Sequence, residues 1–340
     1  MDLKTKLTGW ITRIVILTSL LLGISIFSLL TGSSDIPPGK IISVILEGKT
    51  TAEYSILFDI RLPRIILGFA IGGALSLAGV ILQGMFRNPL VEPYTLGISG
   101  GAALGVCLNI VFHLHRAFGI LTLPLCGFSG AILVIILVYS LSMRRGILRI
   151  QGLLLTGVMI SFISSSLILL IMSVCHLEDL HGIVFWIMGS LEEPNWALIK
   201  LALAVSISGL GVCYLFCLDL NAFSLGEEEA MHLGIDVEKS KRLLFIIASL
   251  LTGCSVSVGG IIGFVGLVVP HFVRMFVGSD HRILLVSSFL CGAAFLIFCD
   301  TLARTVISPL ELPVGVITGI LGGSLFIYAL TKKRVVLGEK

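Results

Sequence analysis

Charged side chains are scarce in this chain of 340 residues, at 13% of the sequence against 56% hydrophobic residues. Soluble domains carry roughly 25% charged residues, and the mean hydropathy of this chain is +1.09. This composition excludes an ordinary soluble domain and predicts an all-α polytopic protein of the plasma or inner membrane. The 38 glycines fit that class, because small residues let transmembrane helices approach closely.

Several motifs are also missing. The sequence has no G-x-x-x-x-G-K-[ST] loop, so we do not expect the chain to hydrolyse ATP or to be an enzyme. Its eight cysteines form no C-x-x-C pair and no Cys/His cluster at zinc-finger spacing, so we expect no metal site, no cofactor and no nucleic-acid partner. Cys213 and Cys217 share a helix face at i, i+4 and could form a soft-metal pair, but simple packing is favoured.

Uncharged stretches long enough to cross a bilayer follow one another along the chain. The first, Ile14–Ser34, lacks a cleavage site, so we predict a retained helix and not a signal peptide. The others are Ile65–Phe86, Pro93–His115, Ala117–Met143, Ile150–Leu177, Leu201–Leu218, Leu243–Val273, Ile283–Cys299 and Leu312–Thr331. Leu243–Val273 is too long for one crossing, and Gly259-Gly260 is predicted to divide it. The result is about ten helices in one domain, residues 1–340, with the helix after Gly260 inside the bundle.

An even number of crossings puts both termini on one side. With the N-terminus inside, most of the 23 lysine and arginine residues fall on inner loops, as the positive-inside rule requires. Both termini are therefore predicted to be cytoplasmic. Arg61 and Arg64 are exceptions on the outer face, one helical turn apart around Pro63. Their planar forks could orient an acidic partner, and snorkelling at the membrane interface is the alternative.

Two outer segments and one inner loop are long enough to have structure. Residues Pro37–Gly48 have an amphipathic pattern, and His176–Trp196 is predicted to hold a short helix between aromatic anchors. The inner loop is Asp219–Arg242. There Ser224-x-x-Glu227 is the pattern of a capping box, and Gly234 is placed to end a helix before Asp236 begins a second short one. Such a pair could dock a cytoplasmic partner, and a solvated connector is the alternative.

From Arg61 onward the motifs resemble the permease family of type II ABC importers, which carry iron–siderophore complexes, haem or cobalamin. The matching stretches are RLPR at 61–64, QGMFRNPL at 83–90, EPYTLGISGGAALG at 92–105, LGEEEAMHLGID at 225–236, GFVGLVVPHFVR at 263–274, GSDHRILL at 278–285, DTLAR at 300–304 and ELPVGVITGILGG at 311–323. One departure is Ser324, where many relatives have proline. The resemblance covers nearly the whole chain.

The resemblance implies a permease subunit that pairs with a second copy of itself around a translocation path for a metal chelate. A cytoplasmic ATPase dimer uses the ATP, and an extracytoplasmic solute-binding protein delivers the cargo. The loop at 219–242 would supply the coupling residues, which are Leu225, Gly226, Glu227, Ala230, Leu233 and Gly234. Arg61, Arg64 and Arg304 would receive glutamates of the binding protein. For Arg304, a local ion pair with Asp300 at i, i+4 is the alternative.

By the same resemblance the fifth and tenth helices line the path. Its expected residues are Met159, Ser161, Ser164, Ser165, Met172, Thr318 and Gly322. Small hydroxyls and thioethers suit release of a bulky chelate, and ordinary helix packing is the alternative. The resemblance favours an iron–siderophore cargo because that is its commonest assignment; haem and cobalamin stay open.

Two other classes of protein compete with this interpretation. An ion-coupled secondary transporter commonly uses ionisable groups at mid-membrane, and only Lys200 and residues near span ends are candidates. An intramembrane serine protease would need Ser99 of Gly97-Ile98-Ser99-Gly100 within hydrogen-bond reach of His271, and a packed helix start is favoured instead. Outer histidines at positions 113, 115, 176 and 181 are interpreted as solvated loop residues, with haem or metal binding as the alternative.

Overall fold

The computed structural model describes residues 3–32, 51–193 and 195–336. Its elements in chain order are α1 (Leu3–Leu30), α3 (Ala52–Ser55), η3 (Ile56–Arg61), α4 (Leu62–Phe86), η4 (Pro93–Leu96), α5 (Ile98–Val111), α6 (Leu114–Phe118), α7 (Thr122–Ser142), β1 (Met143–Arg144), β2 (Ile147–Leu148), α8 (Ile150–Val174), α9 (Leu177–Met188), α10 (Trp196–Leu215), α11 (Cys217–Phe223), α12 (Glu227–His232), α13 (Val237–Gly259), α14 (Val265–Val277), α15 (His281–Thr305) and α16 (Val314–Val336).

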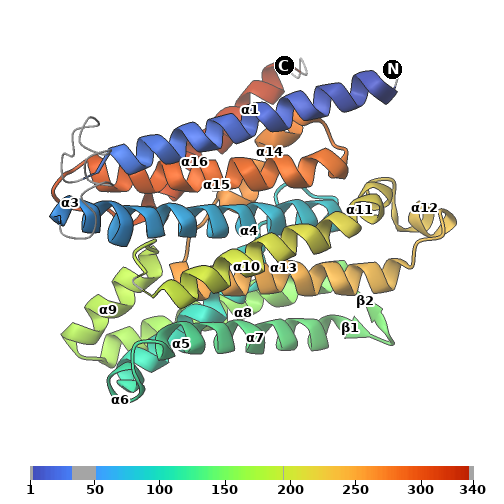
Figure 1. The fold of residues 1–340 in the computed structure, drawn as a ribbon. Helices are drawn as coiled ribbons and strands as arrows, with labels where there is room; N and C mark the ends of the chain where they lie inside the picture. Colours follow the sequence, from blue (N-terminus) through green and yellow to red (C-terminus); the bar gives the residue numbers. More distant parts are fainter. Residues whose placement is uncertain (1–2, 33–50, 194, 337–340) are drawn as a thin grey trace.

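Helix α4 is the centre of the molecule, with α1 and α15 on one side and α10 and α13 on the other (Figure 1). In the most apolar stretch of the helix that contains α4, 89% is buried inside the protein, whereas the corresponding share for α1 at the periphery is 11%. Glycines allow this close packing. A Cβ on Gly72 would clash with the carbonyl oxygen of Gly292 in α15, and one on Gly79 would clash with that of Gly266 in α14.

The predicted all-α fold with about ten membrane helices is confirmed. Within the described residues, 7 helices are long and apolar enough to cross a membrane, and α5, α14 and the part of α16 from Val314 to Ala329 are shorter apolar helices. These correspond one to one with the predicted stretches. Segments predicted outside, with α6 and α9, lie at the opposite end from the β1–β2 hairpin, α11 and α12 (Figure 1). We call these the outer end and the inner end. The cytoplasmic location of the termini stays a prediction.

The predicted division at Gly259-Gly260 is confirmed. Helix α13 ends at Gly259, and Gly260 has a φ of +70° that favours glycine. Helix α14 then begins at Val265, and Val265, Gly266, Val268 and Val269 are buried. The short helix therefore lies inside the bundle, where its neighbours can satisfy the non-helical backbone before it.

The stretch predicted as one helix from Pro93 to His115 is shorter in the structure. Residues Pro93–Leu96 form a 3-10 helix, and Gly97 at a φ of +80° separates it from α5. Proline removes one backbone donor, and a left-handed glycine ends a helix, so the apolar run alone overestimated its length.

The inner loop differs from the predicted helix pair in two respects. The Ser224 hydroxyl donates to the Asn221 carbonyl oxygen, while Gly226 begins α12 without a side-chain cap. The capping box is therefore wrong. Asp236 does cap a helix, accepting from the amide of Lys239, but that helix is the long α13. The short pair is α11 and α12, and Gly234, at a φ of +84°, leads directly into a membrane helix.

Three further expectations concern loops and termini of helices. The short outer helix is confirmed as α9, whereas Pro37–Gly48 lies outside the described residues. Helix α10 ends before Phe216 and α11 begins at Cys217, so Cys213 and Cys217 do not share one continuous helix face. The hairpin of β1 and β2, with Met143 opposite Leu148, was not predicted.

Candidate functional site

Arg61, the first of the predicted docking arginines, is turned into the protein. It is 2% exposed, and its Nη1 donates to the carbonyl oxygens of Leu29 at 2.8 Å and Leu30 at 3.1 Å. These carbonyls belong to the last turn of α1, where helical partners are missing and a cation is favoured. Arg61 therefore fastens the outer end of α1 to the central helix.

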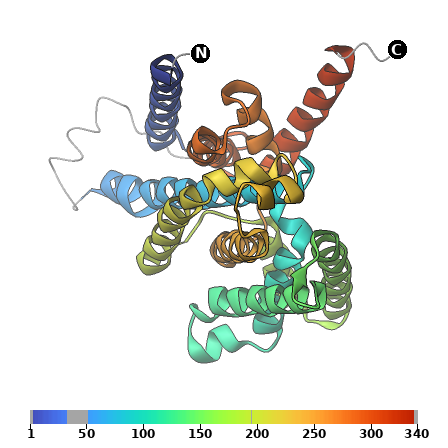
Figure 2. The ribbon, with the colours of Figure 1, turned by 90° about the vertical axis from the view of Figure 1, so that its right-hand side faces the viewer.

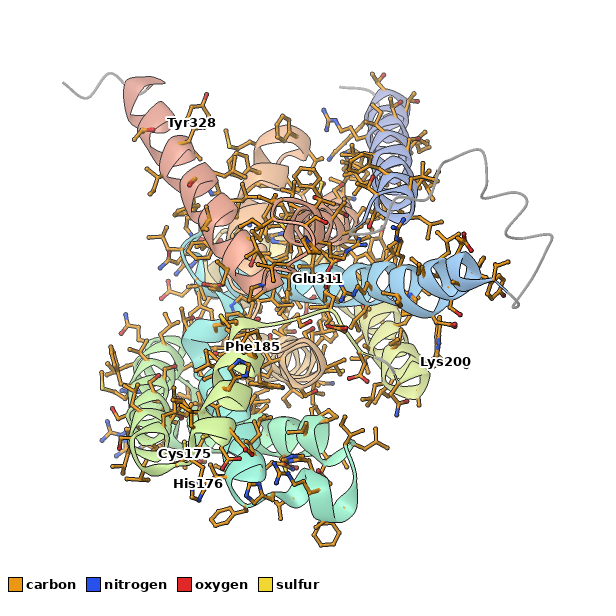
Figure 3. The ribbon with its side chains drawn as sticks, turned by 90° about the vertical axis from the view of Figure 1, so that its left-hand side faces the viewer. Cys175, His176, Phe185, Lys200, Glu311 and Tyr328 are labelled. Atoms are coloured by element: carbon orange, nitrogen blue, oxygen red, sulfur yellow. The ribbon has the colours of Figure 1, made fainter. Side chains whose placement is uncertain are left out.

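Arg64 is 5% exposed and bridges two carboxylates. Its Nη2 lies 2.7 Å from Oε2 of Glu311 and 3.3 Å from Oε2 of Glu192. Its Nε is buried and has no hydrogen-bond partner among the described residues. Glu192 is a loop residue with a 72% exposed side chain, and Glu311 is 37% exposed. Glu311 lies near the middle of the outer end (Figure 3).

Arg304 forms the local ion pair with Asp300 that was the alternative to docking. Its Nε lies 2.9 Å from Oδ2 of Asp300, and its Nη2 donates to the Ser28 hydroxyl at 2.9 Å. Arg304 is 3% exposed and Asp300 is 4% exposed. Like Arg61, Arg304 thus holds α1 to the core.

The structure brings the three arginines to one end of the molecule but gives each an internal partner. The exposed charges beside Arg64 are acidic, which is the opposite of a free cationic patch. Arg64 differs from the other two because its partners are solvent-accessible and its Nε is unused. Docking through these arginines stays a prediction, and Arg64 is the one whose partners could be exchanged most easily.

At the inner end, the predicted coupling residues divide by exposure. Leu225 is 65% exposed, Leu233 is 64% exposed, and Met231 between them is 55% exposed. Gly234 is exposed as well, whereas Gly226 and Ala230 are buried. Figure 2 looks at this end and shows α11 and α12 at its centre. Large exposed apolar side chains close together in the sequence and outside a membrane helix are a feature of protein interaction sites.

Lys241 holds in place the exposed apolar segment, by which we mean Leu225, Met231 and Leu233 with α12. Its Nζ lies 3.1 Å from Oε2 of Glu227 and also pairs with Glu238, while the Lys241 side chain is 3% exposed. Glu238 accepts from the amide of Leu148 at 2.8 Å, which ties the β1–β2 hairpin to α13. Sequence reasoning missed this network, although the lysine one helical turn after Glu238 was a signal for it.

The predicted path residues also divide. On α8, Met159 is 49% exposed and Ser165 is exposed, whereas Ser164 is buried. Ser161 and Met172 are half-buried. On α16, Thr318 is buried and its hydroxyl donates to the carbonyl oxygen of Gly315. In the most apolar stretch of α8 only 22% is buried, so most of that helix faces outwards from the single chain.

A contact between the start of η4 and the segment that links α13 to α14 was not anticipated. Glu92 Oε1 accepts from the amide of Phe264 at 2.7 Å, and the Tyr94 hydroxyl both donates to the carbonyl and accepts from the amide of Ile262. Phe264 has a φ of +69°, which is strained for an aromatic residue. A Cβ on Gly322 of α16 would clash with Phe264. Gly322 is therefore covered by Phe264.

The competing sites gain no support. His271 packs its ring against Phe272 and Phe326, on a helix that contacts α4, α15 and α16, whereas Ser99 lies on α5 against α7 and α8. Lys200 is exposed at the edge of the outer end, not at mid-membrane (Figure 3).

The outer histidines form no metal centre with other residues that the structure describes. Nδ1 of His113 lies 3.7 Å from Oδ1 of Asp179. Among the described residues, no group of three His, Cys, Asp or Glu could hold a metal ion.

Comparison with known proteins points to one family. The model of the FecCD transport family matches residues 20–332. The chain is 39% identical to the hemin transport system permease protein of Yersinia pestis, over 83% of this chain and 85% of that protein. It is 39% identical to the cobalamin import system permease protein of Halobacterium salinarum, over 82% and 74%. It is 35% identical to the Fe(3+) dicitrate transport system permease protein of Escherichia coli, over 95% and 99%.

A solved structure agrees with these sequences. It is described as an inward-facing conformation of a metal-chelate type ABC transporter, and it superposes with a TM-score of 0.82 at 31% identity. The match covers 95% of this chain and 99% of the other. The whole bundle is therefore shared, and not only its central helices.

Proposed function

Because this chain belongs to the FecCD transport family, we propose that its cargo is an iron–siderophore complex. The chain is the permease subunit of a metal-chelate type II ABC importer, a multi-pass protein of the inner membrane. It is not an enzyme, because a separate ATPase subunit hydrolyses the ATP. An ATPase and a substrate-binding protein are therefore implied as partners.

Support for the iron–siderophore cargo comes from relatives along nearly the whole chain. A siderophore transport permease, a dicitrate permease and an iron(3+)-hydroxamate permease each match over 95% or more of this chain. Permeases named for hemin and for cobalamin are 39% identical to this chain over 83% and 82% of its length, against 35% for the three iron permeases. Haem and cobalamin are therefore the alternative cargoes within the same class of importer.

The observation that carries the importer mechanism is the exposed apolar segment Leu225, Met231 and Leu233 at the inner end. Lys241 fixes it to α13, so a force applied there by a partner would reach a membrane helix directly. We infer that this segment contacts the ATPase. The exposed face of α8 supports a second copy of the chain as the other wall of the path.

The cargo is tested on the cognate binding protein. Its melting temperature should rise with a ferric siderophore and stay unchanged with haem or cobalamin, since ligands stabilise the state they bind. A rise with haem or cobalamin alone would replace the proposed cargo by that chelate and would leave the importer class intact.

A further inference from the structure

A cavity of about 430 Å³ opens at the inner end, between the end of α4, α14, the start of α15 and the residue that follows α11. Its volume is in the range of small-molecule sites. The residues around it include two arginines and two histidines, and none of them is an aspartate or a glutamate. The cavity is thus basic, and it is distinct from the exposed apolar segment described above.

The two arginines have unused hydrogen-bonding capacity. Nη1 of Arg274 donates to Oε1 of Gln83 at 3.3 Å, while Nε2 of Gln83 donates to the carbonyl oxygens of Gly266 and Leu267. That orientation leaves Arg274 with a neutral partner. Arg87 is exposed on the loop after α4, at a left-handed φ of +49°. Neither arginine pairs with a carboxylate in the part of the chain that the structure describes.

His281 contributes a buried acceptor. The residue is 3% exposed, and its Nδ1 lies 2.8 Å from Oδ1 of Asn221. The Asn221 side-chain nitrogen donates to Asp280, so its oxygen faces the ring and Nδ1 must carry the proton. Nε2 then bears a lone pair, and it is buried without a hydrogen-bond partner, facing Gly84. Buried polar atoms are nearly always hydrogen-bonded, so a bound ligand that donates here would satisfy Nε2.

We propose that this cavity is a binding site for a phosphate monoester or inorganic phosphate. The guanidinium groups of Arg87 and Arg274 hold the charged oxygens, for which arginine forks are well suited. A phosphate that retains one proton donates it to Nε2 of His281, which a fully deprotonated oxyanion cannot do. The group could reach the site as soluble phosphate or as the headgroup of phosphatidic acid, since the exposed Met275 borders the cavity.

The test uses the assembled importer in nanodiscs of phosphatidylcholine, titrated with inorganic phosphate or with sulfate at neutral pH. Sulfate has the same shape but no proton to donate. Phosphate should raise the melting temperature more than sulfate does. Arg274→Gln should weaken phosphate binding about tenfold, as loss of one charge-assisted bond implies. Arg144→Gln, an equal charge change on the hairpin away from the cavity, should bind as the wild type does.

Nanodiscs containing phosphatidic acid distinguish the two sources. Retention of that lipid through purification, seen by native mass spectrometry and lost in Arg87→Gln, identifies the lipid headgroup. Binding of inorganic phosphate without lipid retention identifies the soluble anion. Equal effects of phosphate and sulfate, equal losses in Arg274→Gln and Arg144→Gln, or no binding in either arm would overturn the proposal.

Discussion

At the scale of single residues, Arg61 and Arg304 both hold α1 against the rest of the bundle. Arg61 donates to carbonyl oxygens of the last turn of α1, and Arg304 donates to the hydroxyl of Ser28, also in α1. Such contacts depend on how α1 packs against α4 and α15. Asp300 and Arg304, four residues apart, were predictable as a pair because their contact is local.

Arg64 is the residue through which docking can be tested without unfolding the protein. Its partners Glu192 and Glu311 remain solvated if the guanidinium is removed. Arg64→Gln should weaken association with the binding protein about tenfold, as loss of one charge-assisted contact implies. Fluorescence anisotropy at low salt measures this.

The matched control for Arg64 is Arg116→Gln, also at the outer end, where Arg116 lies 3.9 Å from Glu178. Arg64→Glu should be rescued by reversing a glutamate of the binding protein. Association that is unchanged in Arg64→Gln would show that Arg64 serves only the fold.

Asp280 gives a pH dependence that arises outside the membrane helices. The hydrogen bond from Arg282, with others from Asn221 and Lys6, holds the pKa of Asp280 well below its ordinary value of 3.8. A lowered folded-state pKa means that this stabilisation is present above the ordinary value and is lost as pH falls through the folded-state value. The melting temperature should therefore fall on acidification below about pH 4, and less steeply in Asp280→Asn.

Glu178→Gln is the control for Asp280, because the Glu178 side chain is 88% exposed. It should keep the wild-type slope of melting temperature against pH. Identical slopes in Asp280→Asn and wild type would exclude Asp280 as the group responsible.

At the scale of elements, long apolar runs predicted which segments form helices, but they did not predict where those helices begin and end. Among the described residues, 7 helices follow from uncharged length, because a bilayer requires about 20 apolar residues for each crossing, whereas α5 and α14 are shorter than that. The start of α5 and the missing capping box were not predictable from composition. Pro93, Gly97 and Gly226 set those ends through backbone conformation, and the Ser224 hydroxyl bonds to a carbonyl oxygen of α11 and not to an amide of α12.

The contact between the start of η4 and the segment that links α13 to α14 should depend on the carboxylate of Glu92. Glu92→Ala leaves the buried amide of Phe264 without its acceptor, which should lower the free energy of unfolding by about 1–3 kcal/mol. Glu92→Gln keeps an oxygen at that position and should restore most of the loss. Chemical denaturation in detergent measures both, and equal destabilisation by the two variants would contradict a hydrogen-bonding role.

The inner apolar segment gives a prediction about coupling. Leu233→Asp places a charge on a side chain that is 64% exposed, so the fold should be retained while contact with the ATPase weakens. Transport should fall at least tenfold if a buried hot-spot contact is lost. Ile147→Asp, at a 54% exposed apolar residue of the hairpin, is the control and should transport normally. Equal losses in both would point to a general effect of charge at this end.

At the scale of the whole molecule, the proposed function requires a second copy of the chain to complete the translocation path. Helix α8 is largely exposed, and α16 does not pack extensively against it within the described residues. Residues Ser164 and Ser165 were predicted together, but only Ser165 faces outwards, because Ser164 packs against Gly100 of α5. The sequence could not distinguish the two serines, because it does not show which face of α8 turns towards α5.

Ser165→Trp should therefore block transport without disturbing the fold, since its ring enters space outside the single chain. Ser173→Trp, also exposed on α8 but near its outer end, is the control. Uptake and size-exclusion profiles measure function and assembly. Normal uptake by Ser165→Trp would remove that residue from the path.

Reconstituted uptake tests the central claim most directly. Proteoliposomes contain this chain with its ATPase, the binding protein is added outside, and uptake of a radioactive iron–siderophore complex is followed. The complex should accumulate only when ATP, the ATPase and the binding protein are all present. Equal uptake by this chain alone, driven by an ion gradient, would contradict an ATP-driven importer.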